Sequence, residues 1–329
     1  YVNYVTEDND FPVRKFINRT SPETRTIGYN KAMMVYHMIE EEIGTESFFD
    51  AWQLVNKKYQ EQKISWEEWM AAFEETSGKD LSHIIPQWID QNSAPILGVR
   101  INDVSGDSID FTLFEKSGQH YRLEVPIHFD TGFDTIVVLH SPSSSYSMQL
   151  SQNVNSISVD PDLHLFRRLY PEEIEPILSA AFGNKNKMFY SDDDTTQFKT
   201  FGNNLTESDV IIHSIQDIST QDKSSLPIIL NPSESVNYIL ERINITDENI
   251  VIAGKAYPRI GHTFILTGQD WNGYKNVLIL FSTDYESLPR IGRLVPHYGK
   301  YSYLVFNGTK NVGKGQWEVT ESPLVKEID

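Results

Sequence analysis

The chain has 329 residues, 39% of them hydrophobic and 22% charged, which is typical of a globular protein that can bury a large core. Its 46 acidic and 28 basic residues give a formal charge of -18, which argues against nucleic acid or an anionic membrane as a partner. Because cysteine is absent, disulfides and thiolate metal sites are excluded, and a metal would need His, Asp or Glu ligands.

Residues 1–98 are predicted to form a helical domain. A tyrosine, Tyr29, follows Gly28 at the start of an amphipathic helix that we expect to end at Gly44. Thr45 can cap a second helix, and Ser65-Trp-Glu-Glu68 is a capping box that opens a third. Apolar residues at helical spacing line one face of the first helix: Ala32, Tyr36, Ile39 and Ile43.

Residues 99–165 are predicted to form a small antiparallel β-sandwich. The hydrophobic period changes from 3.6 to 2 at about Val99, and short strands alternate with turn signals such as Asp130-Thr-Gly132. Strands are expected at 134–140, 146–150 and 157–159. The serine-rich run 141–145 between the first two is expected to be an exposed loop.

Residues 166–329 are predicted to form an α/β domain with a mostly parallel or mixed sheet. Continuous apolar runs, such as Pro227–Leu230 and Val277–Phe281, are typical of strands buried on both faces. Helices are expected at Pro171–Phe182, Ser233–Ile243 and Tyr285–Leu294. The whole chain is thus predicted to combine helical, β-sandwich and α/β domains.

Several short segments in the first 98 residues occur together in a recognisable order. They are Gly28-Tyr-Asn-Lys-Ala32, Ile43-Gly44, Phe48-Phe49, Trp66–Phe73, Ser77-Gly-Lys-Asp-Leu81, and Gln87-Trp88 before Pro95. This order resembles the second half of the catalytic domain of zinc aminopeptidases of the membrane alanyl aminopeptidase (gluzincin metallopeptidase) family. A β-domain commonly follows that half in the family, whereas the predicted α/β domain departs from the family's usual helical C-terminal domain.

The resemblance implies a metallopeptidase, a hydrolase that cleaves the N-terminal peptide bond of a peptide substrate with zinc. Tyr29 would be the catalytic residue that stabilises the oxyanion. Judged by position alone, a core tyrosine at a helix start is the more common role for such a residue. No H-E-x-x-H occurs in the 329 residues, so the zinc of the intact protein would have no ligands here. We therefore expect an inactive C-terminal fragment with no metal and no cofactor of its own.

Three other motifs favour structural roles. The single Asp130-Thr-Gly132 lacks the second carboxylate of an aspartic protease and is predicted to be a hairpin turn. The run Gly308–Gly315 lacks the Ser or Thr of a phosphate-binding loop and is predicted to be a mobile glycine-rich loop. None of the nine histidines pairs with another at i, i+3 or i, i+4, and His37 is interpreted as structural.

A non-catalytic scaffold or a partner- or ligand-binding module is the main alternative. A serine hydrolase is disfavoured because no Gly-x-Ser-x-Gly is present. No apolar run reaches the roughly 18 residues that span a bilayer. The acidic composition and the absence of cysteine favour a bacterial periplasmic or extracellular location. Oligomeric state, substrate preference and the ligand of the α/β domain are left open.

Overall fold

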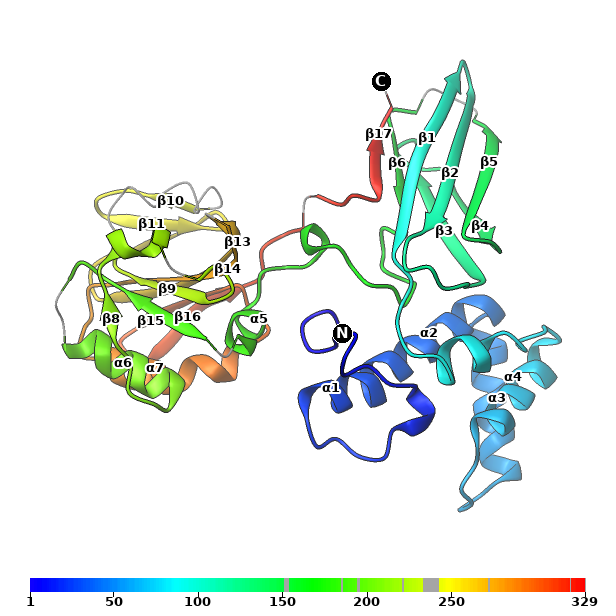
Figure 1. The fold of residues 1–329 in the computed structure, drawn as a ribbon, viewed down its shortest axis with the longest axis horizontal. Helices are drawn as coiled ribbons and strands as arrows, with labels where there is room; N and C mark the ends of the chain where they lie inside the picture. Colours follow the sequence, from blue (N-terminus) through cyan, green and yellow to red (C-terminus); the bar gives the residue numbers. More distant parts are fainter. Residues whose placement is uncertain are drawn as a thin grey trace. The chain divides into compact units, whose positions relative to one another are not determined.

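The computed structural model describes residues 1–150, 154–184, 186–193, 196–220, 222–232, 243–271, 273–319 and 321–328. It is a mixed α and β protein with several sheets, and the chain divides into two compact units (Figure 1). The first unit is Tyr1–Glu173 with Thr320–Asp329, and the second is Ile174–Val319. This division differs from the predicted domains 1–98, 99–165 and 166–329, because the helical and β-rich parts share one core and the last strand returns to the first unit.

The first unit begins with a helical part. Its elements are η1 (Val13–Lys15), α1 (Pro22–Arg25), the π-helical turn η2 (Thr26–Lys31), α2 (Ala32–Ile43), α3 (Thr45–Lys58), α4 (Trp66–Ser77) and the π-helical turn η3 (Ile85–Ile89). The predicted capping box opens α4, where the Ser65 hydroxyl accepts from the Glu68 N–H at 3.3 Å. The prediction for Thr45 is wrong, because Gly44, at φ 85°, occupies the N-cap and no side chain caps α3.

Two antiparallel sheets complete the first unit. One contains β1 (Leu97–Ser105), β2 (Ser108–Glu115) and β5 (Ser143–Gln149), and the other contains β17 (Val325–Glu327), β6 (Ser156–Val159), β3 (Leu123–Phe129) and β4 (Asp134–Leu139). The predicted loop 141–145 is partly strand. Ser143–Ser145 pair antiparallel with residues 112–114 of β2, and the Ser145 and Thr112 hydroxyls, 2.8 Å apart, add a cross-strand hydrogen bond.

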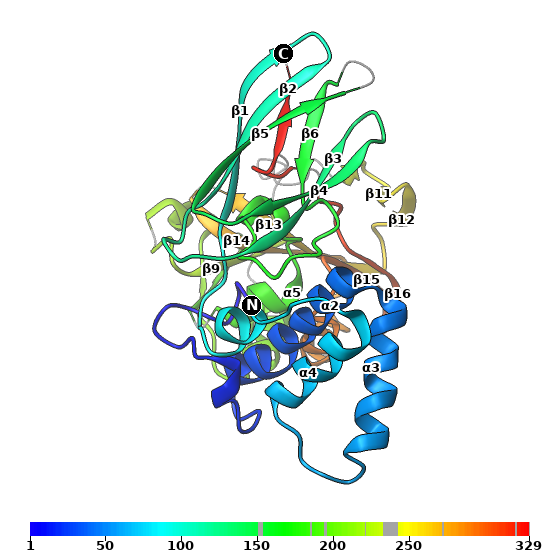
Figure 2. The same ribbon diagram turned by 90° about the vertical axis from the view of Figure 1, so that its right-hand side faces the viewer.

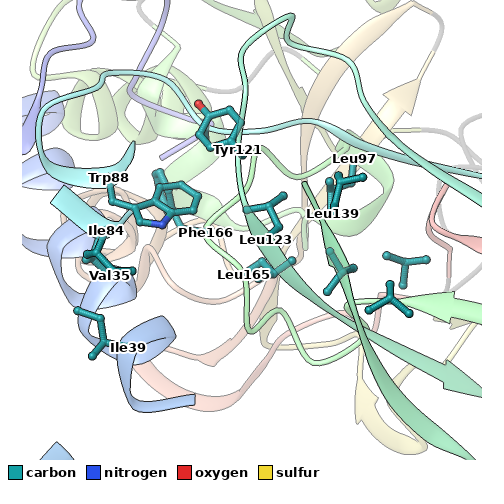
Figure 3. Packing of buried hydrophobic residues seen from close by; sticks show 14 of the residues in the cluster. Val35, Ile39, Ile84, Trp88, Leu97, Tyr121, Leu123, Leu139, Leu165 and Phe166 are labelled. Carbon is teal, nitrogen blue, oxygen red and sulfur yellow. The ribbon is translucent and has the colours of Figure 1, made fainter. Parts of the chain in front are cut away.

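One hydrophobic cluster joins the helices to both sheets. Figure 3 shows members of this cluster from each part of the unit. Trp88 comes from the helical part, Leu165 from the loop after β6, Leu97 from the β1 sheet, and Leu123 and Leu139 from the β3 sheet. Figures 1 and 2 show both sheets on the same side of helices α2 to α4. The helical part and the sheets therefore stabilise each other through a shared core.

The second unit is built on a seven-stranded mixed sheet, of order β16-β15-β13-β14-β9-β7-β8. Its strands are β7 (Lys187–Tyr190), β8 (Ile212–His213), β9 (Leu226–Leu230), β13 (His262–Trp271), β14 (Tyr274–Ser282), β15 (Tyr303–Asn307) and β16 (Lys310–Gly315). Strand β9 pairs in parallel with β14 and β7, whereas β13 pairs antiparallel with β14 and β15. The sheet is therefore mixed, which is one of the two forms that the sequence predicted.

Each face of this sheet is covered by a separate apolar layer. On one face, Ile228 and Leu280 pack against α5 (Leu178–Gly183), α6 (Thr196–Thr206), α7 (Leu288–Leu294) and η7 (Val295–Tyr298). On the other, Ile229 and Ile279 pack against a small sheet of β10 (Ile243–Ile245), β11 (Asn249–Ile252) and β12 (Lys255–Pro258), and against η5 (Ile215–Thr220). Burial on both faces explains the continuous apolar runs of the sequence.

Several predicted elements have other bounds. The segment predicted as the helix 171–182 contains η4 (Pro171–Glu173) and then α5, and the helix predicted at 285–294 begins at Leu288. Residues 233–242 of a third predicted helix lie outside the described residues. Helix α6 was not predicted, because threonine and asparagine with a glycine at 202 obscure its apolar face.

The glycine-rich run is a hairpin and not a loop. Gly308, at φ 57°, forms the turn, and residues 310–315 are strand β16. A Cβ on Gly313 would lie 2.4 Å from the Tyr257 hydroxyl, so the glycine is needed for a close approach and not for mobility. Asp130-Thr-Gly132 forms the predicted turn, with the Gly132 N–H donating to Phe129. No described helix is long and apolar enough to cross a membrane.

Candidate functional site

Tyr29 lies in the π-helical turn η2, where its side chain is half exposed at 50%. Its ring meets Phe16 edge to face with centroids 5.7 Å apart. A Cβ on the preceding Gly28 would lie 2.3 Å from the Phe16 ring, so only glycine lets this turn pack there. Isolated π-helical turns inside helices are frequent at functional sites. The structure thus holds the Tyr29 backbone firmly and leaves the phenol accessible.

Lys31 anchors the same turn to the end of the helical part. Its side chain is fully buried, and Nζ donates to the backbone oxygens of Gln91 at 3.1 Å and Ser93 at 3.2 Å. Burial lowers the pKa of Lys31 to about 8, while the nearby Asp10 carboxylate acts in the opposite direction. The Asp10 carboxylate also accepts from the Tyr1 hydroxyl and the Ser93 N–H. Lys31 therefore fixes the position of η2 relative to residues 91–93.

A small cavity of about 60 Å³ lies between the helical part and the sheet within the first unit. Its lining residues are Met38, Glu41, Glu42, His83, Ile84, Trp88, Arg122, Leu123, Glu124, Pro126, Ile136, His164 and Leu165. Tyr29 is not among them. The predicted catalytic tyrosine and this cavity are therefore separate features of the unit.

An ionic network forms one wall of the cavity. Glu42 accepts from Arg122 Nη1 at 3.2 Å and lies 3.3 Å from His83 Nε2, while Arg122 Nη2 donates to Glu124 at 3.1 Å. Burial alone would raise the pKa of Glu42, but hydrogen bonds and charge from His83 and Arg122 hold it below its usual value. Glu42 is therefore an anion at neutral pH.

A second group is formed by His37, Glu41 and His164, of which Glu41 and His164 line the cavity. His37 and Glu41 are one turn apart on α2, and His164 comes from the loop after β6. His37 Nε2 lies 2.9 Å from His164 Nδ1, and this atom lies 3.7 Å from a Glu41 carboxylate oxygen. Each of the three residues offers one potential ligand atom, and these atoms all lie within 4.8 Å of one another. The three residues together could therefore hold a metal ion.

Sequence reasoning missed this group for a clear reason. No two histidines share a helical ligand spacing, whereas His37 and Glu41 share the i, i+4 spacing. The third member is 127 residues away from His37 along the chain. A mixed His-x-x-x-Glu pair was visible in the sequence, but nothing local could indicate His164.

Buried charges hold the loop that carries His164. Arg167 Nε donates to Asp160 at 2.7 Å, and Arg167 Nη1 donates to Glu173 at 2.7 Å, with all three side chains buried. Burial opposes ionisation of Glu173, but hydrogen bonds from Arg167 and Ser322 keep its pKa low. All three partners lie within the first unit.

Two polar residues of the second unit have structural roles. The Asp192 carboxylate accepts from the Ser214 hydroxyl and the Ile215 N–H, each at 3.1 Å. Gln269 donates to the backbone of Ile174. His297 borders a broad hollow in the second unit, beside Arg293 and Asp209.

Comparisons with known proteins find similarity to proteins that are named aminopeptidases. No protein-family profile matches the chain. It is similar to the protein named probable aminopeptidase 2 of Sulfurisphaera tokodaii, with 24% identity over 177 residues that cover 51% of this chain and 22% of that protein. Among solved structures, Legionella pneumophila aminopeptidase A in complex with aspartic acid matches with a TM-score of 0.39 and 15% identity, over 44% of this chain and 18% of that one. The chain thus spans about a fifth of the length of the curated relative, and the similarity is to an aminopeptidase without specifying the gluzincin family.

Proposed function

We propose that this chain is the C-terminal part of a zinc-dependent aminopeptidase-like metallopeptidase, with Tyr29 as a catalytic residue of the intact protein. The observation that carries the proposal is the accessibility of the Tyr29 phenol on a turn that Phe16 and Lys31 hold in place. A core tyrosine, the main structural alternative, would have its ring packed inside the helices. The sequence similarity to an aminopeptidase supports the same proposal.

The proposed chemistry of Tyr29 is the donation of one hydrogen bond. Attack on a peptide carbonyl places negative charge on its oxygen, and a fixed phenol O–H stabilises that charge more than it stabilises the neutral substrate. Peptide hydrolysis of this class draws its nucleophile from a zinc-bound water. The chain has no H-E-x-x-H to hold such a zinc, so the proposal assigns to these residues only the oxyanion contact.

A partner-binding module is a second candidate, and one observation favours it. Met33, four residues after Tyr29, is 62% exposed, and Ile17, next to Phe16 in the sequence, is 90% exposed. Large apolar side chains exposed near one another can mark a binding surface. In that case Tyr29 would contribute its ring and not its hydroxyl.

The substitution Tyr29→Phe distinguishes the two candidates, because it removes the hydroxyl and keeps the ring. In the full-length protein, we expect kcat for aminoacyl p-nitroanilide hydrolysis to fall about 100- to 1000-fold with little change in KM, the loss typical of one oxyanion donor. Tyr59→Phe, at a half-buried tyrosine after α3, is the matched control and should keep full activity.

Two outcomes would overturn the proposal. One is full activity of the Tyr29→Phe protein. The other is hydrolysis of the same substrate by residues 1–329 alone with added zinc, since the proposal leaves the nucleophile outside this chain. If the residues encoded upstream lack a zinc-ligand motif, the binding-module candidate takes precedence.

A further inference from the structure

The group of His37, Glu41 and His164 has the properties of a metal site. A metal bound there would be distinct from the zinc of the proposed function. The i, i+4 spacing puts His37 and Glu41 on the same face of α2, one turn apart. His164 approaches that face from the loop after β6, so that the two imidazole rings stack with centroids 5.1 Å apart.

The distances suit a small ion with tetrahedral geometry. Zinc binds imidazole nitrogen and carboxylate oxygen at about 2.0–2.2 Å, which places neighbouring ligand atoms about 3.3 Å apart. His37 Nε2 and His164 Nδ1 share a hydrogen bond at 2.9 Å, which a bound ion would replace, and His164 Nδ1 lies 3.7 Å from Glu41. These two separations lie on either side of that value. The Glu41 side chain is 53% exposed and can rotate to adjust its position.

The histidine from the loop is held in place before any ion binds. Asp160, whose φ is 50°, accepts from Arg167 and from the Leu165 N–H at 3.2 Å, which closes the loop around His164. The Phe166 N–H approaches the Met38 sulfur at 3.3 Å, which ties the loop to the residue next to His37. Ligands that are already ordered lose little conformational entropy on binding an ion.

The ligand types indicate the class of ion. Two imidazoles and one carboxylate suit a divalent transition metal, above all zinc, and suit calcium or magnesium poorly because those ions take mostly oxygen ligands. Among the described residues, no further His, Asp or Glu joins the group. A bound ion would therefore keep a water or another small ligand at its remaining position.

We infer that His37, Glu41 and His164 form a binding site for one divalent transition-metal ion, zinc by preference, which connects helix α2 to the loop 160–166. The inference does not depend on the proposed peptidase function. The ion would join the helical part of the first unit to the loop that follows β6, beside the cavity.

The test uses residues 1–329, which contain no H-E-x-x-H, so the upstream zinc of the proposed function cannot contribute. After removal of metal with a chelator, titration with Zn²⁺ by calorimetry should give one ion per chain. Titration with Co²⁺ should give the visible absorption bands of a tetrahedral site, and Zn²⁺ should abolish them. Hydrogen exchange in the peptide that contains 160–166 should slow when Zn²⁺ binds.

Variants locate the ion. Even the hydrogen-bond partners of metal ligands typically contribute about 10- to 100-fold to affinity, so loss of a ligand should weaken binding at least about 100-fold. We expect this for Glu41→Gln, which changes a side chain that is 53% exposed, and for His164→Gln. The matched controls are Glu40→Gln, which removes the same charge from the same helix, and His120→Gln at an exposed histidine.

The result that overturns the inference is equally clear. It is either the absence of stoichiometric Zn²⁺ binding, or binding that Glu41→Gln and His164→Gln weaken no more than Glu40→Gln and His120→Gln. The second pattern would place the ion elsewhere on the acidic surface.

Discussion

The two units of the protein are built around different interiors. The first buries charged side chains among its apolar residues, including Lys31, Arg167 and the carboxylates of Asp160 and Glu173. The second is organised around a sheet whose strand β9 is buried at every position by apolar side chains. Hydrogen bonds and ion pairs are directional, whereas apolar packing mainly requires volume and shape. The first unit therefore has the means to position individual side chains, and the candidate sites lie there.

The largest effect is expected from breaking the buried ion pairs. Arg167→Met keeps most of the side-chain volume but leaves two carboxylates buried without a counter-charge. Removal of one partner of a buried pair costs about 3–5 kcal/mol, and the loss should be towards the upper end because both Asp160 and Glu173 depend on Arg167. Hydrogen exchange measured by mass spectrometry should accelerate in β3 and β6, while β9 and β14 keep their protection.

The converse experiment disturbs the apolar sheet of the second unit. Phe306 is fully buried on the face that packs against α6 and α7, and truncation of a buried phenylalanine costs about 3–5 kcal/mol. Phe306→Ala should therefore accelerate exchange in β13 and β15 and leave β3 unchanged. If either substitution accelerated hydrogen exchange in both units, the stabilities of the two units would be coupled. That result would contradict the division of the chain into two units.

The same contrast explains what could be predicted from the sequence. The strands of the second unit were visible because burial on both faces leaves continuous apolar runs, as in Val277–Phe281. The capping box at Ser65 is local and was predicted correctly. The group of His37, Glu41 and His164, and the burial of Lys31, depend on contacts between residues 60 to 127 positions apart. No local pattern encodes such contacts, so the sequence could indicate the elements but not the sites between them.

Lys31 provides a prediction that depends on pH. Its pKa is about 8 in the folded protein and near 10.5 when exposed, so between these values the unfolded chain binds more protons than the folded one. The free energy of unfolding should therefore rise with pH across this window, by on the order of 3 kcal/mol from this group, and stay level below it. Denaturant titrations at pH 7.5–10, followed by tryptophan fluorescence, would measure the slope.

The control separates Lys31 from other groups. Lys31→Met should make the rise with pH much smaller, although Lys187 and the N-terminal amine, whose pKa values burial also lowers, still contribute to it. Lys57→Met, at an exposed position on α3, should retain the full rise. Above the Lys31 window the trend should reverse, because burial raises the pKa of Tyr36 to about 12 and the folded state then holds the proton longer. A slope at pH 8–10 that is the same with and without Lys31 would show that its ammonium group is not desolvated as the structure indicates.

The smallest effect should come from Arg14, which matches Arg167 in chemistry but not in surroundings. Each guanidinium contacts two carboxylates, and for Arg14 these are Glu67 at 2.7 Å and Asp90. The Arg14 side chain is 40% exposed, whereas that of Arg167 is 1% exposed. Exposed ion pairs contribute about 0.2–1 kcal/mol each and are screened by salt, since the Debye length is about 3 Å at 1 M.

Arg14→Met should therefore lower the free energy of unfolding by no more than about 1 kcal/mol, and 1 M NaCl should remove most of that difference. Arg167→Met should stay strongly destabilising in the same salt, because solvent ions do not reach its partners. If both substitutions responded to salt alike, burial would not be what distinguishes the two arginines, and the contrast between a charged interior and a charged surface in the first unit would be lost.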